Sequence, residues 1–128
     1  MMKKLLVLLF SILISFNSYG DWVYVAGDST ADGFIDKKTI KEQNGYVYFW
    51  VLQNKLTADE TGIMSVKVYA QGDCEIDRVR FLTYRAYKEP MGNGEKEDKY
   101  TPVNPEWDFT SPDSVGGTYL YYACDYVK

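Results

Sequence analysis

Segments rich in β-branched and aromatic residues recur along the first part of the chain, separated by polar turns. The pattern predicts short strands at Trp22–Val25 and Phe34–Asp36, with turn residues at Gly27–Gly33 between them. The polar stretch Lys37–Gly45 ends in Asn-Gly, a dipeptide that adopts positive φ at low cost and is a strong hairpin signal. We therefore expect β-structure from residue 22 onward.

Three longer apolar segments predict the interior of the sheet. Tyr46–Leu52 is apolar or aromatic throughout, which is typical of a central strand covered on both faces. After a polar connector at Asn54–Thr61, Ile63–Tyr69 alternates apolar and polar residues, as a half-buried strand does. Cys74–Tyr87 carries apolar residues at both odd and even positions, so we expect another interior strand with its charges near the ends or at a bulge.

The end of the chain has a different pattern. Ser111–Ser114 combines a capping hydroxyl, a proline and an acid, which together signal a helix start. Val115, Tyr119, Tyr122 and Tyr126 then recur with helical spacing. Two adjacent glycines weaken the helix by about 1 kcal/mol each. Residues 119–127 also fit a last β-strand, and the local pattern leaves both structures open.

Residues 88–105 contain three prolines, two glycines and a run of charges, and we expect a mobile loop there. Loops of this length are uncommon in compact domains and are often functional. The alternative is a solvated hairpin tip without a partner. The residues that we expect to contact a binding partner are Lys88, Glu95, Lys96, Glu97, Asp98, Lys99 and Tyr100.

The first twenty residues have the pattern of a secretory signal, and residues 21–128 are predicted to form a single domain. Lys3 and Lys4 precede the apolar run Leu5–Phe16, and Ser18–Gly20 is a small-x-small cleavage pattern, so the mature chain would begin at Asp21. The apolar run is shorter than the ~20 residues that span a bilayer. We expect an exported protein without stable membrane insertion.

The composition excludes several functions. The chain has no histidine, which excludes Ser-His-Asp and Cys-His catalysis and a histidine-ligated zinc or haem. The mature part has 12 basic and 18 acidic residues, a net charge of −6, which argues against binding nucleic acid or anionic lipid. We expect no enzyme activity and no cofactor.

Two cysteines, Cys74 and Cys124, lie in the exported part. Two cysteines in an oxidising compartment most simply form one disulfide. The alternatives are two free thiols or a redox pair, but the two residues are fifty apart and lack a C-x-x-C motif. The disulfide would stabilise the domain by roughly 4 kcal/mol at most.

Two groups of acidic residues have spacings that a metal site or a hydrolase could use. In Asp28–Thr39 the oxygen ligands and glycine of a calcium loop are present, but Thr39 stands where a bidentate glutamate is needed, so we expect no metal site. Glu75 and Asp77 lie two residues apart on one predicted strand face, with Arg78 and Arg80 on the other. A carboxylate pair can catalyse hydrolysis without histidine, but cross-strand ion pairs are the ordinary explanation. The abundant aromatic residues fit either the core or a binding surface.

Several short motifs together resemble a known family. They are, in chain order, Phe34–Asp36 with Thr39, Ile40 and Gly45; Val47, Trp50 and Leu52 as V-x-x-W-x-L; Cys74, Arg78, Arg80 and Leu82 as C-x-x-x-[RK]-x-R-x-L; and Trp107, Ser111–Val115 and Cys124. This pattern resembles the bacterial surface-adhesin E (protein E-like) family of small exported proteins.

The resemblance implies an α+β, mainly β fold. A curved antiparallel sheet of about six strands would carry a C-terminal helix on one face, tied by the Cys74–Cys124 disulfide, which favours the helix over the last strand. It also implies binding to host matrix or plasma proteins, and a possible homodimer. The chain lacks a lipid-attachment cysteine. The alternative is therefore a periplasmic structural, accessory or small-ligand-binding protein whose partner is an envelope protein.

Overall fold

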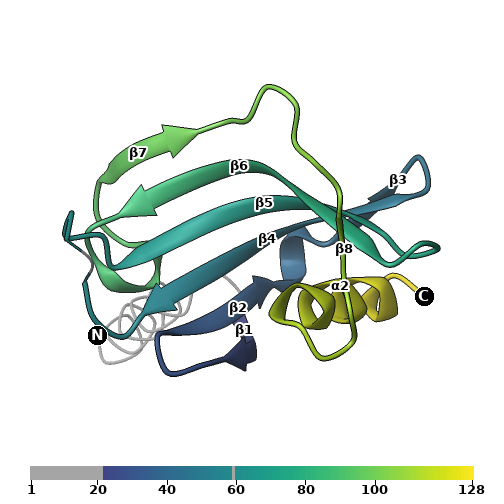
Figure 1. The fold of residues 1–128 in the computed structure, drawn as a ribbon, viewed down its shortest axis with the longest axis horizontal. Helices are drawn as coiled ribbons and strands as arrows, with labels where there is room; N and C mark the ends of the chain where they lie inside the picture. The colour runs from purple at the N-terminus through teal and green to yellow at the C-terminus, as the bar shows by residue number, and fades with distance from the viewer. Residues whose placement is uncertain (1–21, 59) are drawn as a thin grey trace, which may run out of the picture.

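The computed structural model describes residues 22–58 and 60–128 as an antiparallel sheet with one C-terminal helix (Figure 1). Strands run in the order β1-β2-β4-β5-β6-β7, while β3 pairs with β4 and β8 with β6. The elements are β1 (Trp22–Gly27), β2 (Ala31–Asp36), η1 (Lys37–Thr39), β3 (Lys41–Gln43), β4 (Tyr46–Lys55), β5 (Ser65–Asp73), β6 (Arg78–Tyr87), η2 (Pro90–Gly92), β7 (Lys96–Tyr100), β8 (Asp108–Phe109) and α2 (Val115–Tyr126). The fold class predicted from the resemblance is confirmed.

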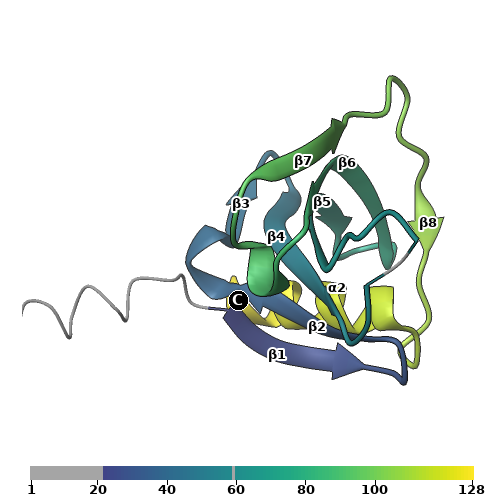
Figure 2. The ribbon, with the colours of Figure 1, turned by 90° about the vertical axis from the view of Figure 1, so that its left-hand side faces the viewer.

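The sheet is curved, from β1 at the bottom of Figure 2 to β7 at the top, and α2 lies inside the curve. We call the side that contacts α2 the helix face. Its core consists of Ile35, Ile40, Val47, Phe49, Val51, Val68, Ala70 and Val79 from the sheet side and Tyr119, Leu120 and Ala123 from the helix. These side chains are 8% exposed or less, so the helix and the sheet share one apolar core.

The central position of β4 is confirmed. It pairs with β2 and β3 along one edge and with β5 along the other. Val47, Phe49 and Val51 are buried on the helix face, whereas Tyr48 and Trp50 are half-buried on the opposite face. Alternating side chains of a strand point to opposite faces, so one strand serves two different surfaces.

The turn between β3 and β4 was predicted from the sequence, and the turn between β5 and β6 was not. Asn44 and Gly45 have φ of 54° and 82°, and they form the predicted turn between β3 and β4. Residues 74–77, expected to begin a strand, are instead the turn between β5 and β6. Asp73 Oδ1 accepts hydrogen bonds from the main-chain N–H groups of Glu75 and Ile76, and this local bonding competes with strand pairing.

The predicted turn Gly27–Gly33 is too long. Ala31–Gly33 already belongs to β2, and the tight turn is closed by the Asp28 carboxylate, which accepts from the N–H groups of Thr30 and Ala31. Gly33 is required in the strand because a Cβ there would collide with the Tyr119 hydroxyl. The glycine that this close approach requires made the start of β2 look like part of a turn in the sequence.

The C-terminal helix is present, but two of its details differ from expectation. Its N-cap is Ser114, whose hydroxyl accepts from Gly117 N–H, rather than Ser111. Val115 and Tyr126, expected on the buried stripe, are 41% and 52% exposed. Tyr119 of the predicted stripe is buried and Tyr122 is partly buried against the core, but the other buried residues are Gly117, Leu120 and Ala123, so the buried stripe is rotated from the one that the tyrosine spacing suggested.

The predicted disulfide joins Cys74 to Cys124, with 5.9 Å between the Cα atoms. It ties the β5–β6 turn to the last turns of α2. Within the described residues no free cysteine is left.

The mobile loop expected over residues 88–105 is largely wrong. Pro90–Gly92 forms a short 3-10 helix whose N–H groups reach the sheet, from Met91 to Asn54 Oδ1 and from Gly92 to the buried Ser65 hydroxyl. Lys96–Tyr100 forms β7, an edge strand paired with β6. Every side chain of β7 is exposed, so the alternation that marks a half-buried strand is missing.

The predicted signal, residues 1–20, lies outside the described residues. Among the described residues, no helix is both long and apolar enough to cross a membrane.

Candidate binding surfaces

The sheet face that points away from α2 carries a set of aromatic and cationic side chains. We call it the aromatic–cationic face. Its members come from β1, β4, β5, β6 and the segment before β8, and they are Trp22, Tyr46, Tyr48, Trp50, Lys67, Tyr69, Arg78, Arg80, Arg85, Tyr87 and Trp107.

Cations and rings are in direct contact on this face. The guanidinium carbons of Arg78 and Arg80 lie 4.2 and 4.4 Å from the centroid of the same Trp107 ring. Arg85 lies 4.7 Å above Trp50, and Lys67 Nζ lies 5.1 Å from the Tyr87 ring. Cation–π contacts of this kind contribute about 0.5–2 kcal/mol each, more where water is excluded.

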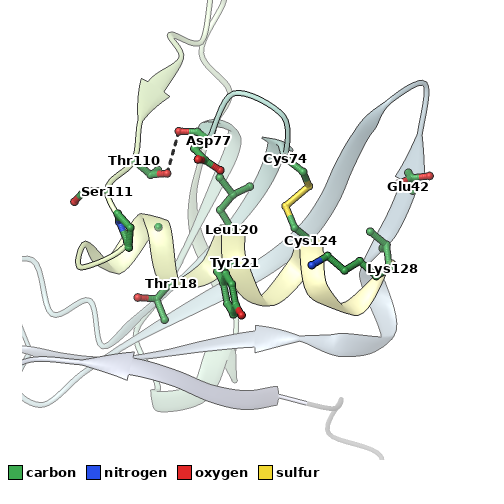
Figure 3. Close-up of a pocket in the computed structure, with 13 residues that line it drawn as sticks. Glu42, Cys74, Asp77, Thr110, Ser111, Thr118, Leu120, Tyr121, Cys124 and Lys128 are labelled. Carbon is green, nitrogen blue, oxygen red and sulfur yellow. Dashed lines mark hydrogen bonds between the residues drawn. A yellow bond between two sulfur atoms is a disulfide. The ribbon is translucent and has the colours of Figure 1, made fainter.

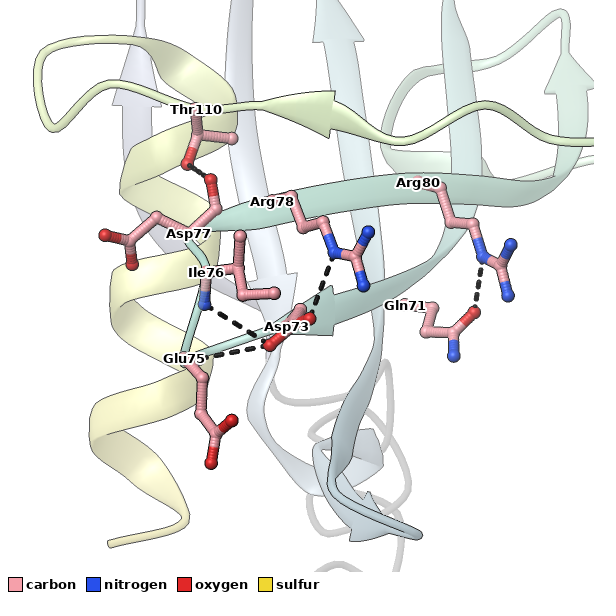
Figure 4. A network of polar contacts seen from close by, with 8 residues as sticks. All are labelled: Gln71, Asp73, Glu75, Ile76, Asp77, Arg78, Arg80 and Thr110. Carbon is pink, nitrogen blue, oxygen red and sulfur yellow. Dashed lines mark hydrogen bonds and ion pairs between the residues drawn. The ribbon is translucent and has the colours of Figure 1, made fainter.

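Side-chain hydrogen bonds also link neighbouring strands on this face. Arg80 Nε donates to Gln71 Oε1 at 2.7 Å, and Gln71 Nε2 donates to the Tyr48 hydroxyl at 3.1 Å, so β6, β5 and β4 are linked in one row. In the next row Arg78 Nε contacts Asp73 Oδ2 at 3.0 Å. Figure 4 shows both arginines extending to the same side of β6.

Lys67 is half-buried on the same face, as are Arg78 and Arg80. Burial, followed by the charge of Arg85, lowers the pKa of Lys67, while Asp36 raises it. Arg85 Nε is buried without a hydrogen-bond partner among the described residues. Positive charge is therefore concentrated on this face, and both burial and the neighbouring Arg85 disfavour the charged form of Lys67.

The predicted carboxylate pair is not brought together on a strand. Glu75 and Asp77 are both turn residues, and Asp77 has φ of 55°. Asp77 lines a cavity of about 500 Å³ beside the disulfide, together with Glu42, Tyr121 and residues of α2 (Figure 3). Its carbonyl oxygen accepts from both the N–H and the hydroxyl of Thr110, so this residue also anchors the segment before the helix.

The acidic residues that match part of a calcium loop each have a separate structural role. Asp28 closes the β1–β2 turn and its pKa is lowered, chiefly by the Thr30 hydroxyl. Asp36 caps η1 by accepting from Lys38 N–H. Among the described residues, no three acidic, cysteine or histidine side chains are grouped as metal ligands would be.

The predicted partner-contact residues of β7 are exposed. Lys88 and Glu97 form an exposed ion pair at 3.7 Å. Tyr100 is 61% exposed, and its ring lies 6.0 Å from that of Tyr84. Lys99 pairs across the strands with Arg85, so β7 continues the positive charge of the aromatic–cationic face to the edge of the sheet.

A second cavity, of about 430 Å³, opens between the first half of α2 and β4–β6. We call it the helix groove. Its lining is mostly apolar, and its members include Val51, Val66, Val68, Phe81, Tyr84, Asp108, Phe109, Val115 and Tyr119. The Tyr119 hydroxyl is buried without a hydrogen-bond partner among the described residues. Burial, with a smaller effect of Tyr24, raises the pKa of Tyr119 to about 12.

Sequence reasoning missed the aromatic–cationic face as a unit. The local pattern puts Arg78 and Arg80 opposite a carboxylate pair, and it does not divide the aromatic residues between core and surface. Opposite Tyr69 and Ala70, β6 carries one extra residue, Leu82, so Arg85 faces the same side as Arg80 despite their odd separation. The alternation of charged Arg78 and Arg80 with apolar Val79 is the sequence signal that places both arginines on the face opposite the core.

Comparison with known proteins supplies the context for these surfaces. The model of a family described as surface-adhesin protein E matches residues 22–125. Crystal form II of Haemophilus influenzae protein E is 18% identical, with a TM-score of 0.62 over 84% of this chain and 91% of that chain. Protein E from non-typeable Haemophilus influenzae is 21% identical, with a TM-score of 0.53 over 80% and 72%. No curated protein sequence matches the chain. At these identities the structural similarity concerns the fold.

Proposed function

The chain belongs to the surface-adhesin protein E family, and we propose that it is an exported, non-catalytic protein that binds a protein partner in an adhesin-like role. The partner is a host matrix or plasma protein, or an envelope protein if the chain stays in the periplasm. The proposal assigns no cofactor.

The observation that carries this proposal is the composition of the aromatic–cationic face. Tryptophan, tyrosine and arginine dominate the few residues that supply most of the energy of protein interfaces. Here Trp50, Trp107 and Arg80 lie on one face of the sheet, and they are half-buried rather than packed under another layer. Side chains already stacked on one another lose little further freedom on binding.

The β7 segment is proposed as the second part of the interface. It carries charges of both signs, and Lys99, opposite Arg85, borders the aromatic–cationic face, whereas the exposed Tyr100 packs on Tyr84 toward the helix groove. Charges at an edge strand also hinder edge-to-edge pairing between copies of a protein, which suits a partner bound through side chains.

Export is part of the same proposal. A signal at residues 1–20 would be removed, leaving a mature chain that begins at Asp21. N-terminal sequencing of the protein recovered from the medium or periplasm is expected to give Asp21 first. Recovery of the intact protein with Met1 from the cytoplasm would contradict export.

Partner capture tests the face directly. Mature protein is immobilised and probed with matrix proteins, plasma and a periplasmic extract. We expect Trp107→Ala to reduce capture at least tenfold, and Tyr121→Ala, an exposed aromatic of α2, to leave it unchanged. Equal capture by both variants would overturn the aromatic–cationic face as the interface.

The β7 segment has its own variant. Lys96→Ser with Lys99→Ser removes two exposed charges without deleting the strand. A smaller loss of capture, about two- to fivefold, is expected of exposed charges at an interface rim.

The helix groove favours a second candidate function, the binding of a small apolar ligand. Its apolar lining, its volume of about 430 Å³ and the exposed Phe109 at its wall support it. Titration with N-phenyl-1-naphthylamine tests it: fluorescence enhancement that Val68→Phe abolishes would support this function, and enhancement unaffected by that variant would contradict it.

A further inference from the structure

We propose that Arg78 and Arg80 form a carboxylate-binding pair for an extended acidic segment of a protein, with acidic side chains two residues apart. This inference rests on the proposed function and names the chemistry that the aromatic–cationic face recognises.

Positive charge is distributed unevenly over the molecule. The mature chain is acidic overall, yet its three arginines, Arg78, Arg80 and Arg85, all lie on β6 and all face away from α2. Such a local excess of positive charge on an acidic protein steers an acidic ligand to one face.

Both arginines keep hydrogen-bond donors that the described part of the fold does not use. Arg78 and Arg80 each bond within the protein through Nε, to Asp73 and to Gln71. In the part of the chain that the structure describes, the terminal amino groups of both arginines make no hydrogen bond. These groups can donate to a carboxylate, and a charge-assisted hydrogen bond is roughly twice as strong as a neutral one.

Both guanidinium groups are preorganised. The Trp107 ring lies against both guanidinium groups, and the bonds to Asp73 and Gln71 fix their orientation. An arginine held in this way loses less side-chain entropy when it binds. The Asp73 carboxylate does not occupy the site, because its second oxygen accepts from the turn N–H groups.

The spacing selects the form of the ligand. Arg78 and Arg80 are alternate residues of one strand, so their Cα atoms lie roughly 6.5–7 Å apart. Alternate side chains of an extended peptide repeat at the same interval. An acidic segment with the pattern acid-x-acid therefore places one carboxylate at each arginine. Tyr46 and Tyr48 alternate along β4 in the same way and offer rings to the remaining side chains.

Two capped octapeptides of equal composition provide the test. One has glutamate and serine in strict alternation, and the other has them in alternating pairs, so both carry four carboxylates but only the first has the two-residue spacing. Titration into the mature protein at low salt is expected to show at least tenfold tighter binding of the alternating peptide. Addition of 0.5 M salt is expected to weaken it.

The variants separate a guanidinium pair from simple charge. Arg78→Lys with Arg80→Lys keeps the positive charge opposite Asp73 but removes the forked donors, and we expect it to abolish the preference for the alternating peptide. Lys128→Gln lowers the net charge at the end of α2 and is the matched control, for which a change of less than twofold is expected. Thermal melting of each variant shows that the fold is intact.

Three outcomes would overturn the inference. These are equal affinity for the two peptides, an unchanged preference in the lysine variant, or tighter binding of a sulfated heparin oligosaccharide than of the alternating peptide, which would indicate a polysaccharide ligand. If Trp107→Ala still reduces partner capture in these cases, the proposed function stands while this inference fails. If Trp107→Ala does not reduce partner capture but the alternating peptide still binds, the carboxylate-binding pair stands and the proposed function fails.

Discussion

The two faces of the sheet use their aromatic and apolar residues in opposite ways. On the helix face, Phe49 is fully buried between its strand neighbours and the helix, in a core completed by Leu120. On the aromatic–cationic face, Trp50 and Tyr69 are only half-buried, and their rings lie 4.9 Å apart with Arg85 above one of them. One face is covered by a helix, and the other is covered by its own side chains, by the Trp107 ring and, beside Lys67, by η2.

The difference separates the face that stabilises the fold from the face proposed to bind a partner. Burial under α2 removes apolar surface from water completely, which is the dominant stabilising contribution in folding. Stacked rings and guanidinium groups remain partly hydrated and keep donors available. A small sheet can therefore fold on one face and leave the other for a partner.

The largest expected effect separates two adjacent residues of β4. Phe49→Ala leaves a cavity in the core of the helix face and is expected to cost about 3–5 kcal/mol of unfolding free energy. Tyr48→Ala, one residue away on the aromatic–cationic face, removes a half-buried ring and is expected to cost about 1–2 kcal/mol. Urea unfolding of the mature protein measures both. Equal losses would mean that the two faces contribute alike to stability.

The second effect concerns the attachment of the helix. Replacing Cys74 and Cys124 by alanine releases a constraint on a loop of 50 residues, and a loss of about 2–4 kcal/mol is expected. Unfolding is compared with that of the oxidised protein, with and without reductant. Binding of the alternating peptide should persist in the folded fraction, since Arg78 and Arg80 lie on the other face. Loss of binding without loss of stability would contradict this separation.

The parts of the fold that follow from local chemistry were predictable from the sequence. Asn44-Gly45 has few conformations open to it, so the hairpin was recognised. Tyr46–Leu52 was recognised as central because it is apolar at positions of both parities. Two cysteines in an exported chain left few alternatives to the observed disulfide.

What failed depended on contacts between distant segments. Lys96–Tyr100 is a strand only because β6 offers an edge, and nothing in its own composition indicates pairing. Gly33 is small because Tyr119 approaches it from eighty-six residues away. The aromatic–cationic face required the register of three strands and the position of Trp107, which no local pattern contains.

The third effect concerns the one polar atom that the described helix-face core leaves unsatisfied, the Tyr119 hydroxyl. Burial raises its pKa from an ordinary value near 10 to about 12. Between these values only the unfolded chain loses the proton, so this contribution to stability is complete below pH 10 and falls by up to about 2–3 kcal/mol as the pH rises to 12.

Tyr119→Phe is expected to remove that dependence. At pH 7 the variant should equal the wild type or exceed its stability by about 1 kcal/mol, because an unpaired hydroxyl leaves the core. Every other tyrosine is present in both proteins, so the difference between the two unfolding curves isolates Tyr119. Parallel curves from pH 9 to pH 12 would contradict the assigned burial.

The smallest effect separates two neighbouring glycines at the start of α2 and tests how closely the helix is held. A Cβ at Gly117 would meet the Ser111 carbonyl oxygen at an impossible distance, so Gly117→Ala must displace the segment before the helix and is expected to cost about 1–3 kcal/mol. A Cβ at Gly116 would have its nearest neighbour 3.7 Å away, at the Thr110 methyl. Gly116→Ala is therefore expected to add about 0.4–1 kcal/mol, since alanine favours the helix and restricts the unfolded chain. Unfolding measurements should place the two variants on opposite sides of the wild type. If both stabilise, the helix tolerates a looser junction than the contact at Ser111 implies.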